Sequence, residues 1–303
     1  MTKNVLDRKK IVAKPFVKWA GGKGNLLNAL ESHLPDDFGI QEKVTYIEPF
    51  VGGGAMLFHM LSTHPNIRRV VINDINKDLI RCYQLVKEAP SVLIELLKPF
   101  EQRYHELDED ERRDYYYEVR REYNNIELTA DQRAAHLIFL NHTCFNGLYR
   151  ENANGGFNVP FGRYKKPKIC NEEVIKADHE VLSKVDIYCG DYKSMFSHLG
   201  KGYNFVYFDP PYRPLLGSTN FKDYSKCSFG DKEQVELKSF CDRLTAKGCK
   251  LMLSNSDSNN DDGSSFFQSL YDGYTFEIVL APRFINAYAE RREKQTEMLI
   301  KNY

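Results

Sequence analysis

The sequence predicts an α/β fold in which a mostly parallel sheet is covered by helices on both faces and carries an inserted helical part. Two observations support this prediction. Short β-branched or aromatic runs alternate with helical periodicity along most of the chain, and this alternation stops between residues 101 and 180. A chain of 303 residues is long enough for one large domain or two unequal ones. We therefore expect an α/β domain formed by 1–98 and 181–303, with a helical domain inserted at 99–180.

The predicted strands are short apolar runs that are typical of buried strands. They cover Val44–Glu48, Arg69–Asn73, Val185–Cys189, Tyr203–Asp209, Cys249–Ser254, Phe276–Leu280 and Thr296–Lys301. Helical periodicity is clearest over 79–97 and 231–246. The insert opens with a charged helix that carries Tyr115-Tyr-Tyr117 and continues with an apolar helix around Ala134–Leu140. A Gly-, Asn- and Pro-rich segment, Asn146–Pro167, follows without a strand pattern.

The composition excludes several classes of protein. Apolar residues make up 42% of the chain, the mean hydropathy is −0.52, and no run approaches the roughly 18 apolar residues of a membrane span. The basic N-terminus has no apolar stretch behind it, so we expect no secretory signal. The seven cysteines have irregular spacing, which favours reduced thiols in a cytoplasm over a disulfide framework. The eight histidines show no ligand spacing, so we expect no metal.

The charge is balanced overall but uneven along the chain. Lys plus Arg and Asp plus Glu both number 42, which by itself counts against a nucleic-acid-binding protein. Residues 101–122, however, hold nine acids and five bases, whereas 141–170 hold five bases and one acid. This pattern suits a neutral protein with one basic face.

A glycine cluster, Glu48-Pro-Phe-Val-Gly-Gly-Gly54, ends the first predicted strand. Glycines at this position let the backbone turn tightly and approach a ligand. Asn73-Asp74 ends the next strand, where α/β nucleotide-binding folds place a carboxylate that binds ribose hydroxyls. An ordinary glycine turn followed by an Asp helix cap is the alternative interpretation.

A second cluster, Lys18-Trp19-Ala20-Gly21-Gly22-Lys23, precedes the first strand. Its spacing is not that of a Walker phosphate loop. The only Trp of the chain beside two glycines could form a flat wall of a binding site. A capped helix start with the Trp in the core is an equally good interpretation.

The most informative motif is Asp209-Pro210-Pro211-Tyr212, which follows a strongly apolar strand. Ligands of open α/β sheets bind at the carboxyl ends of the strands, which is where this tetrapeptide falls. The two prolines restrict the backbone, so the Asp209 carboxylate and the Pro210 carbonyl would converge on one point. Two acceptors at one point suit an amino group, and the Tyr212 ring would stack on a planar base that carries it. A Pro-rich turn with an unrelated Asp is the alternative.

These motifs, in this order, resemble the Dam family of DNA adenine-N6 methyltransferases over nearly the whole chain. The segments that carry the resemblance are Phe16–Lys23, Glu48–Gly54, Asn73–Asn76, Asn146–Arg150, Phe157–Pro167 and Asp209–Tyr212. The resemblance implies a Rossmann-like AdoMet-dependent methyltransferase sheet with an inserted helical DNA-recognition domain. It also implies transfer of a methyl group from S-adenosylmethionine to N6 of a flipped adenine in double-stranded DNA, within GATC.

The resemblance further assigns roles to particular residues. Asp209, Pro210 and Tyr212 would be catalytic. Residues near S-adenosylmethionine would be Trp19, Ala20, Gly21, Lys23, Glu48, Phe50, Gly52, Asp74, Ile75, Asp191 and Asp209.

The DNA contacts implied by the resemblance come mostly from the Gly-, Asn- and Pro-rich segment. Composition alone shows only a basic loop with interleaved aromatic residues, and without the neighbouring motifs such a loop is more often a solvated surface loop. By resemblance, Arg150 would read a guanine edge, Lys18 would contact the outer guanine, and Phe145 would wedge into the base stack. The remaining contacts would come from Asn146, Leu148, Pro160, Arg163 and Tyr164.

Other interpretations remain open at this stage. An AdoMet-dependent RNA or protein-glutamine methyltransferase could share the sheet, although such enzymes usually begin the tetrapeptide with Asn. Cytosine methylation is disfavoured because no cysteine follows a proline. A nicotinamide dehydrogenase would not account for Asp-Pro-Pro-Tyr, and a non-catalytic DNA-binding regulator would not need it.

The chain departs from the family around 283–292, where a Ser/Asn/Gly-rich basic turn is usual. We expect a cytoplasmic protein with no obligatory protein partner and no membrane contact, and with a restriction enzyme as a possible cognate.

Overall fold

The computed structural model describes residues 12–19, 21–213, 229–256, 265–281 and 295–303. Ala20 and the divergent segment 283–292 lie outside the described residues. Within them, no helix is both long enough and apolar enough to cross a membrane.

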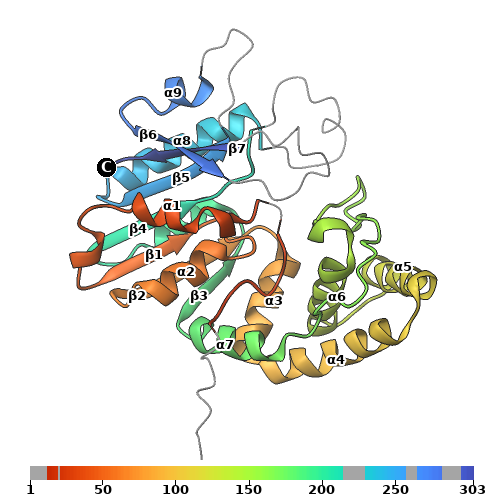
Figure 1. The fold of residues 1–303 in the computed structure, drawn as a ribbon. Helices are drawn as coiled ribbons and strands as arrows, with labels where there is room; N and C mark the ends of the chain where they lie inside the picture. Colours follow the sequence, from red (N-terminus) through yellow and green to blue (C-terminus); the bar gives the residue numbers. More distant parts are fainter. Residues whose placement is uncertain (1–11, 20, 214–228, 257–264, 282–294) are drawn as a thin grey trace, which may run out of the picture.

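The strands of the described residues form one seven-stranded sheet with the order β3-β2-β1-β4-β5-β7-β6 (Figure 1). Strands β1 to β5 run parallel, and β7 lies antiparallel between β5 and β6. The bounds are β1 Val44–Glu48, β2 Ile67–Asp74, β3 Val185–Cys189, β4 Tyr203–Phe208, β5 Lys250–Ser256, β6 Thr275–Ala281 and β7 Gln295–Lys301. Each predicted strand overlaps one of these, and the predicted mostly parallel α/β sheet is confirmed.

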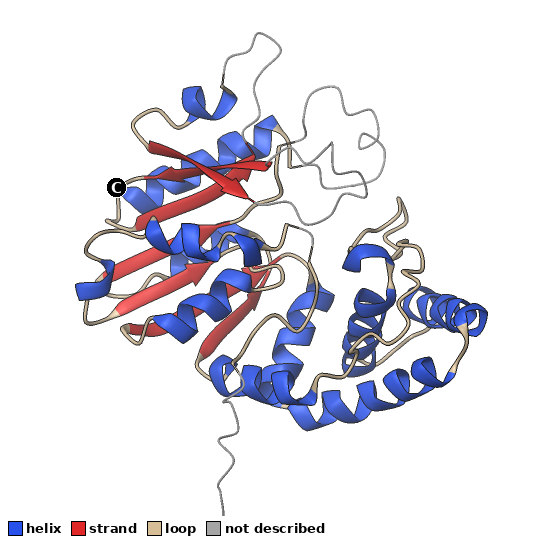
Figure 2. Cartoon of the chain, viewed as in Figure 1, coloured by secondary structure: helices blue, strands red, loops and turns tan. Residues whose placement is uncertain are grey.

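The helices surround the sheet and fill the insert (Figure 2). Their bounds are α1 Leu27–Ser32, α2 Ala55–Thr63, α3 Lys77–Glu88, α4 Pro90–Glu106, α5 Glu109–Asn125, α6 Ala130–Thr143, α7 Glu172–Leu182, α8 Asp231–Thr245 and α9 Phe266–Leu270. The shorter 3₁₀ turns are η1 Lys23–Asn25, η2 Phe38–Ile40, η3 Phe145–Gly147 and η4 Tyr192–His198. The periodic stretch 79–97 is divided between α3 and α4, because Ala89 leaves the helical conformation (φ −145°) and Pro90 starts the next helix.

Alternate residues of the central strands enter two separate hydrophobic cores, as the period of two in a strand requires. On β2, Val70 and Ile72 pack into the core beneath α2 and α3, whereas Val71 packs into the core beneath α8. The same alternation places Tyr207 and Phe208 of β4 on opposite faces. Both faces of the sheet are therefore covered, and its carboxyl-terminal edge remains for a binding site.

The insert packs on α3 and is built from α4, α5 and α6, which form a group to one side of the sheet in Figure 1. Capping boxes start two of these helices: Asp108 with Glu111 begins α5, and Thr129 with Gln132 begins α6. Helices α4 and α7 each cross one of the predicted boundaries at 98 and 180. The predicted division into two domains stays a prediction.

An ion pair connects α6 to α3. The Arg133 guanidinium on α6 donates from Nε to both carboxylate oxygens of Asp78 on α3, at 2.8 and 2.9 Å. The Tyr123 hydroxyl on α5 donates to the same carboxylate. One carboxylate therefore holds three helices together.

Candidate active site

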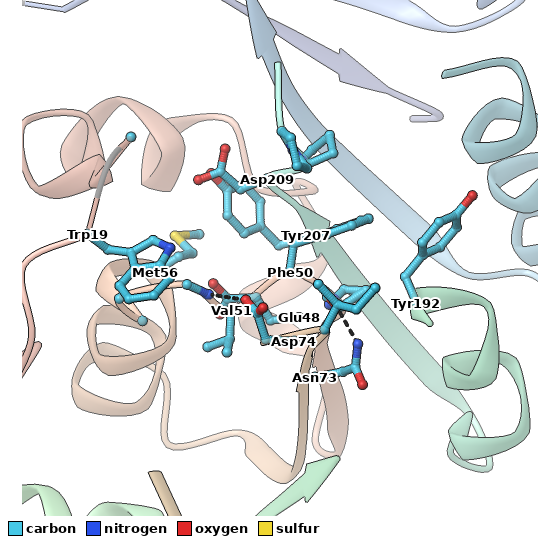
Figure 3. Close-up of a pocket in the computed structure, with 18 of the residues that line it drawn as sticks. Trp19, Glu48, Phe50, Val51, Met56, Asn73, Asp74, Tyr192, Tyr207 and Asp209 are labelled. Carbon is cyan, nitrogen blue, oxygen red and sulfur yellow. Dashed lines mark hydrogen bonds between the residues drawn. The ribbon is translucent and has the colours of Figure 1, made fainter. Parts of the chain in front are cut away.

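The candidate site is a cavity of about 1250 Å³ at the carboxyl-terminal edge of the sheet (Figure 3). Three acidic residues reach it from adjacent strands: Glu48 ends β1, Asp74 ends β2, and Asp209 follows β4. Strand order reverses between β1 and β4, because successive strands add on one side as β1-β2-β3 and on the other as β4-β5. Open α/β sheets bind their ligands at such a switch point.

The glycine turn after β1 is held against Asp74. The Gly52 N–H donates to Asp74 Oδ2 at 3.0 Å, and the Asn76 N–H donates to Oδ1 at 2.9 Å. Gly52 and Gly54 have φ angles of +49° and +75°, a region that residues with a side chain rarely adopt. A Cβ on Gly54 would also lie 2.5 Å from the Tyr83 hydroxyl. The glycines are therefore required by backbone conformation and close packing.

Trp19 forms one wall of the cavity. Its indole lies against the glycine turn, since a Cβ on Gly52 would approach Trp19 Cδ1 to 3.0 Å. The Tyr149 ring stacks on the indole, with centroids 5.2 Å apart and an interplanar angle of 20°. Tyr149 also lines the cavity and belongs to the insert. A residue of the predicted DNA-recognition segment thus contacts the wall of the cavity.

Burial displaces the pKa values of the carboxyl groups that end β1 and β2. Burial raises the pKa of Glu48 well above its usual value, although the Tyr46 hydroxyl donates to Glu48 Oε2 at 2.8 Å and opposes the shift. Burial also raises the pKa of Asp74, against the backbone N–H groups that donate to it. Burial makes the charged form of these carboxyl groups costly, and a positively charged ligand would offset that cost. The two groups therefore suit a ligand with positive charge.

The opposite end of the cavity is largely apolar. The Phe50 ring lies 5.1 Å from that of Tyr192 and 5.9 Å from that of Phe229, measured between centroids. Ile75 is 71% exposed although it is aliphatic, and it lines the same space. Asp191 caps η4 by accepting from the Lys193 N–H at 2.8 Å. This end offers apolar surface to a planar ring.

The Asp-Pro-Pro-Tyr corner faces the cavity and is joined to Lys23. The Lys23 ammonium lies 2.8 Å from Asp209 Oδ1 and donates to the Tyr212 hydroxyl at 2.7 Å. The Tyr212 hydroxyl in turn donates to Glu297 Oε1 on β7 at 2.8 Å. Lys23 is 4% exposed and the Glu297 side chain 7%, so these charges are almost fully removed from solvent.

The Asp209 carboxyl keeps 22% of its surface exposed, on the side of the cavity. Burial raises the pKa of Asp209 to about 6, while the Lys23 ammonium opposes that rise and the Glu297 carboxylate adds to it. Near neutral pH the group is therefore mainly a carboxylate, which accepts hydrogen bonds.

The predicted catalytic and cofactor-contacting residues converge on this one cavity. Those that line it are Trp19, Gly21, Lys23, Glu48, Phe50, Gly52, Asp74, Ile75, Asp191, Asp209, Pro210 and Tyr212. Ala20 lies outside the described residues. Among the described residues, no group of three or more His, Cys, Asp and Glu side chains is arranged to hold a metal ion.

Apart from Lys18, the predicted DNA-contacting residues lie on two segments between residues 145 and 164 that run side by side. The Phe145 N–H donates to the Pro160 carbonyl at 2.8 Å, and an isolated bridge joins Cys144 to Phe161. Phe145 is half exposed, and Asn146 beside it has a left-handed φ of 54°. An apolar ring is therefore presented to solvent at the tip of a strained turn.

Arg150 and its neighbours extend this surface. The Arg150 guanidinium donates from Nε to Asn158 Oδ1 at 2.6 Å and from Nη2 to the Asn158 carbonyl at 3.2 Å. Leu148 is half-buried, whereas Arg150 and Arg163 are exposed. Arg163 also has a left-handed φ, of 57°.

Lys18 joins this surface to the cavity. Its ammonium lies 4.3 Å from the Tyr164 ring centroid. Its backbone is held by Asn141 of α6, which accepts from the Lys18 N–H at 2.7 Å and donates to the Lys18 carbonyl at 2.6 Å. Asn141 also donates to the Gly147 carbonyl at 3.0 Å. One buried amide therefore fixes the segment before Trp19 to the recognition turn.

Sequence reasoning missed four residues of this region: Asn141, Tyr149, Asn158 and Glu297. Two of them leave a signal in the sequence, because Asn141 directly follows an apolar run, Glu297 directly precedes one, and buried polar groups need partners. Tyr149 and Asn158 leave none, since an aromatic or amide residue in a loop is ordinarily exposed.

Fold and site together define a Rossmann-like methyltransferase, with a ligand cavity at the switch point and an Asp-Pro-Pro-Tyr corner beside it. Comparison of the sequence with known protein families defines the class more closely. The family model of the D12 class N6 adenine-specific DNA methyltransferases matches residues 19–282. The chain belongs to this family, as its resemblance to the Dam enzymes had predicted, and it is an adenine-specific DNA methyltransferase.

Relatives support the same assignment over nearly full length. The chain is 44% identical to the type II methyltransferase M.MjaIII of Methanocaldococcus jannaschii, over 96% of this chain and 99% of the relative. It is 35% identical to the type II methyltransferase M1.LlaDCHI of Lactococcus lactis subsp. cremoris, over 99% of each. It is 33% identical to the DNA adenine methylase of Haemophilus influenzae, over 96% of this chain and 94% of that enzyme.

Proposed function

We propose that this enzyme transfers a methyl group from S-adenosylmethionine to N6 of adenine in double-stranded DNA, within GATC, after the adenine has been flipped out of the duplex. One observation carries the proposal. The Asp209 carboxyl opens into the same cavity as the glycine turn and Asp74. A place for a nucleoside and a place for an amine are thereby adjacent.

The residues of the cavity fit S-adenosylmethionine. Its adenine ring suits the apolar end formed by Phe50 and Ile75, and its ribose hydroxyls suit Asp74. Its sulfonium and ammonium groups are positive, and the cavity is lined by carboxyl groups whose pKa values burial raises, Glu48 and Asp74 among them. When bound, this cofactor supplies an electrophilic methyl group.

The corner after β4 would orient the acceptor nitrogen. Asp209 and the Pro210 carbonyl each accept one N–H of the adenine amine, and the Tyr212 ring stacks on the base. With both N–H groups bound, the nitrogen lone pair is aimed at the cofactor side of the cavity. Catalysis is then mainly orientation and electrostatics, and Asp209 need not be a strong base because the alkylated amine is acidic enough to lose its proton.

The exposed turn of the insert would open the duplex. Phe145 wedges into the base stack and Asn146 approaches the base that flipping leaves unpaired. Unstacking costs a few kcal/mol. The Phe145 ring is already exposed to solvent on this left-handed turn, so that binding to DNA need not pay a separate cost for ordering the loop.

Recognition of GATC would use the side chains around this turn. Arg150, oriented by Asn158, donates to a guanine edge, and such a bidentate contact discriminates by about 1–3 kcal/mol. Lys18 contacts the outer guanine, while Leu148 and Pro160 meet the thymine methyl. Arg163 and Tyr164 add contacts to phosphates and bases. A cytoplasmic location, the absence of an obligatory protein partner and a cognate restriction enzyme stay predictions.

The test is to incubate an unmethylated plasmid with the enzyme and S-adenosylmethionine and to map modified adenines by single-molecule sequencing. We expect N6-methyladenine at GATC on both strands and at no other motif. Methylation at another motif would overturn the recognition roles but leave the reaction standing. No modification at any adenine would overturn the proposed reaction.

A further inference from the structure

Glu297 is a buried acid that neither the family motifs nor the proposed reaction uses. It lies on β7, which is paired on both sides, just before the apolar residues Met298 to Ile300 and opposite Val279 of β6. It is 6% exposed, and its neighbours Met298 and Leu299 are fully buried. An isolated carboxylate in such surroundings is costly, so its partners indicate its role.

Both partners of Glu297 belong to the active site. Its Oε1 accepts from the Tyr212 hydroxyl at 2.8 Å and lies 3.4 Å from the Lys23 ammonium. Glu297 itself does not line the cavity, but it contacts Tyr212 and Lys23, which do. Any effect of Glu297 on the cavity must therefore pass through Tyr212 and Lys23.

The hydrogen bonds of Lys23 show why a second carboxylate is needed. The ammonium has three N–H donors, which point to the Gly21 carbonyl at 3.0 Å, the Tyr212 hydroxyl at 2.7 Å and Asp209 Oδ1 at 2.8 Å. The proposed reaction requires Asp209 to accept from the adenine amine. Lys23 competes for that carboxylate, and without Glu297 the buried ammonium would have no counter-charge once Asp209 bound the amine.

We propose that Glu297 is a positioning residue for methyl transfer, which holds the Tyr212 ring and supplies Lys23 with a second carboxylate so that Asp209 becomes available to the adenine amine. The inference rests on the proposed role of Asp209. Because Lys23 Nζ already lies 2.8 Å from one carboxylate and 3.4 Å from the other, a rotation of its N–H groups and a small shift exchange the two partners.

The charged and titratable groups that face Asp209 determine its ionisation. They are Lys23 of η1, Tyr46 and Glu48 of β1, Tyr207 of β4, Tyr212, and Glu297 of β7. Of these, Lys23 lowers the pKa of Asp209 and Glu297 raises it. Removal of the Glu297 charge should therefore lower the pKa of Asp209 and bind Lys23 to it more tightly.

The test uses Glu297→Gln, which removes the charge but keeps an oxygen that can accept from Tyr212. We expect the single-turnover rate of methyl transfer to fall by roughly tenfold, which is a typical effect when two residues in contact are energetically coupled. We also expect the acidic limb of the pH–rate profile to move to lower pH, which loss of packing alone would not cause. Glu277→Gln is the matched control, because Glu277 lies on the adjacent strand, pairs with Lys301 and does not line the cavity.

A double-mutant cycle with Lys23→Met tests whether the effect passes through Lys23. In that background, Glu297→Gln should give a smaller loss of rate than in the wild-type enzyme. A wild-type rate for Glu297→Gln, a reduced rate with an unmoved acidic limb, or the same loss in both backgrounds would each overturn the inference. Failure of the wild-type enzyme to methylate adenine in the same assay would instead count against the proposed function.

Discussion

The Lys23 ammonium and the Asp209 carboxylate form an ion pair, with Nζ 2.8 Å from Oδ1, between two residues that line the cavity. Lys23 comes from the turn before the first strand and Asp209 from the end of the fourth. The pair therefore joins two of the motifs that the sequence singled out, which lie far apart along the chain.

The first prediction concerns pH. Because burial raises the pKa of Asp209 to about 6, methyl transfer should fall on acidification below about pH 6, as the carboxylate loses its capacity to accept. Lys23→Met removes the charge that lowers this pKa, so the acidic limb of kcat/KM should move to higher pH. Profiles of the two enzymes with one DNA duplex measure the shift. A limb at the same pH in both would show that another group controls activity.

The second prediction concerns the glycine turn. Gly54→Ala forces a side chain into a φ of +75° and places its Cβ 2.5 Å from the Tyr83 hydroxyl. The left-handed conformation alone costs about 1–2 kcal/mol. Urea unfolding should show a loss of at least this size, together with weaker binding of S-adenosylmethionine. Gly39→Ala is the control, because its Cβ meets no atom within 4 Å. Equal stability of the two variants would contradict the packing described here.

The third prediction concerns Tyr149. Its ring stacks on Trp19, so Tyr149→Ala should leave the indole without support on one side and weaken binding of S-adenosylmethionine by roughly three- to tenfold, the worth of an aromatic pair. Trp19 is the only Trp of the chain, and its fluorescence reports the cavity directly. Tyr149→Phe keeps the stack and should bind normally. Equal loss in both variants would point to the hydroxyl rather than to the ring.

The fourth prediction concerns stability. Burial raises the pKa of Asp178 to about 8, and its Oδ2 has no hydrogen-bond partner among the described residues. The folded pKa lies above the unfolded one, so folding takes up a proton, and the stability present below about pH 4 is lost as the pH rises towards 8. Asp178→Asn should raise the free energy of unfolding at pH 8 by an amount on the order of a few kcal/mol and change it little at pH 4. A gain that is equal at both pH values would refute this.

The strands and the main motifs could be predicted because each carries its own physical signal. Apolar runs such as Tyr203–Phe208 can be buried on both faces only inside a covered sheet. Gly52 and Gly54 free the backbone, and Pro210 and Pro211 restrict it, whatever the surrounding fold. Because the carboxyl ends of parallel strands share one edge, the convergence of Asp74 and Asp209 follows from the strand order.

Other features depend on tertiary contacts that the sequence does not encode locally. The hydrogen bond between Tyr212 and Glu297 depends on the position of β7 between β5 and β6 in the sheet. The stack of Tyr149 on Trp19 depends on how the insert packs against the cavity. Helical periodicity runs through Ala89, and only the Pro at position 90 marks the boundary between α3 and α4.

The role of Asp209 is tested most directly by transfer of a tritiated methyl group from S-adenosylmethionine to duplex DNA by Asp209→Ala. Asp186→Ala is the control, since Asp186 lies on β3 outside the cavity with its side chain 45% exposed. Trp19 fluorescence verifies that the cofactor still binds to both variants. We predict a loss of roughly a hundredfold or more for Asp209→Ala and a normal rate for the control. Near-normal transfer by Asp209→Ala would contradict the account.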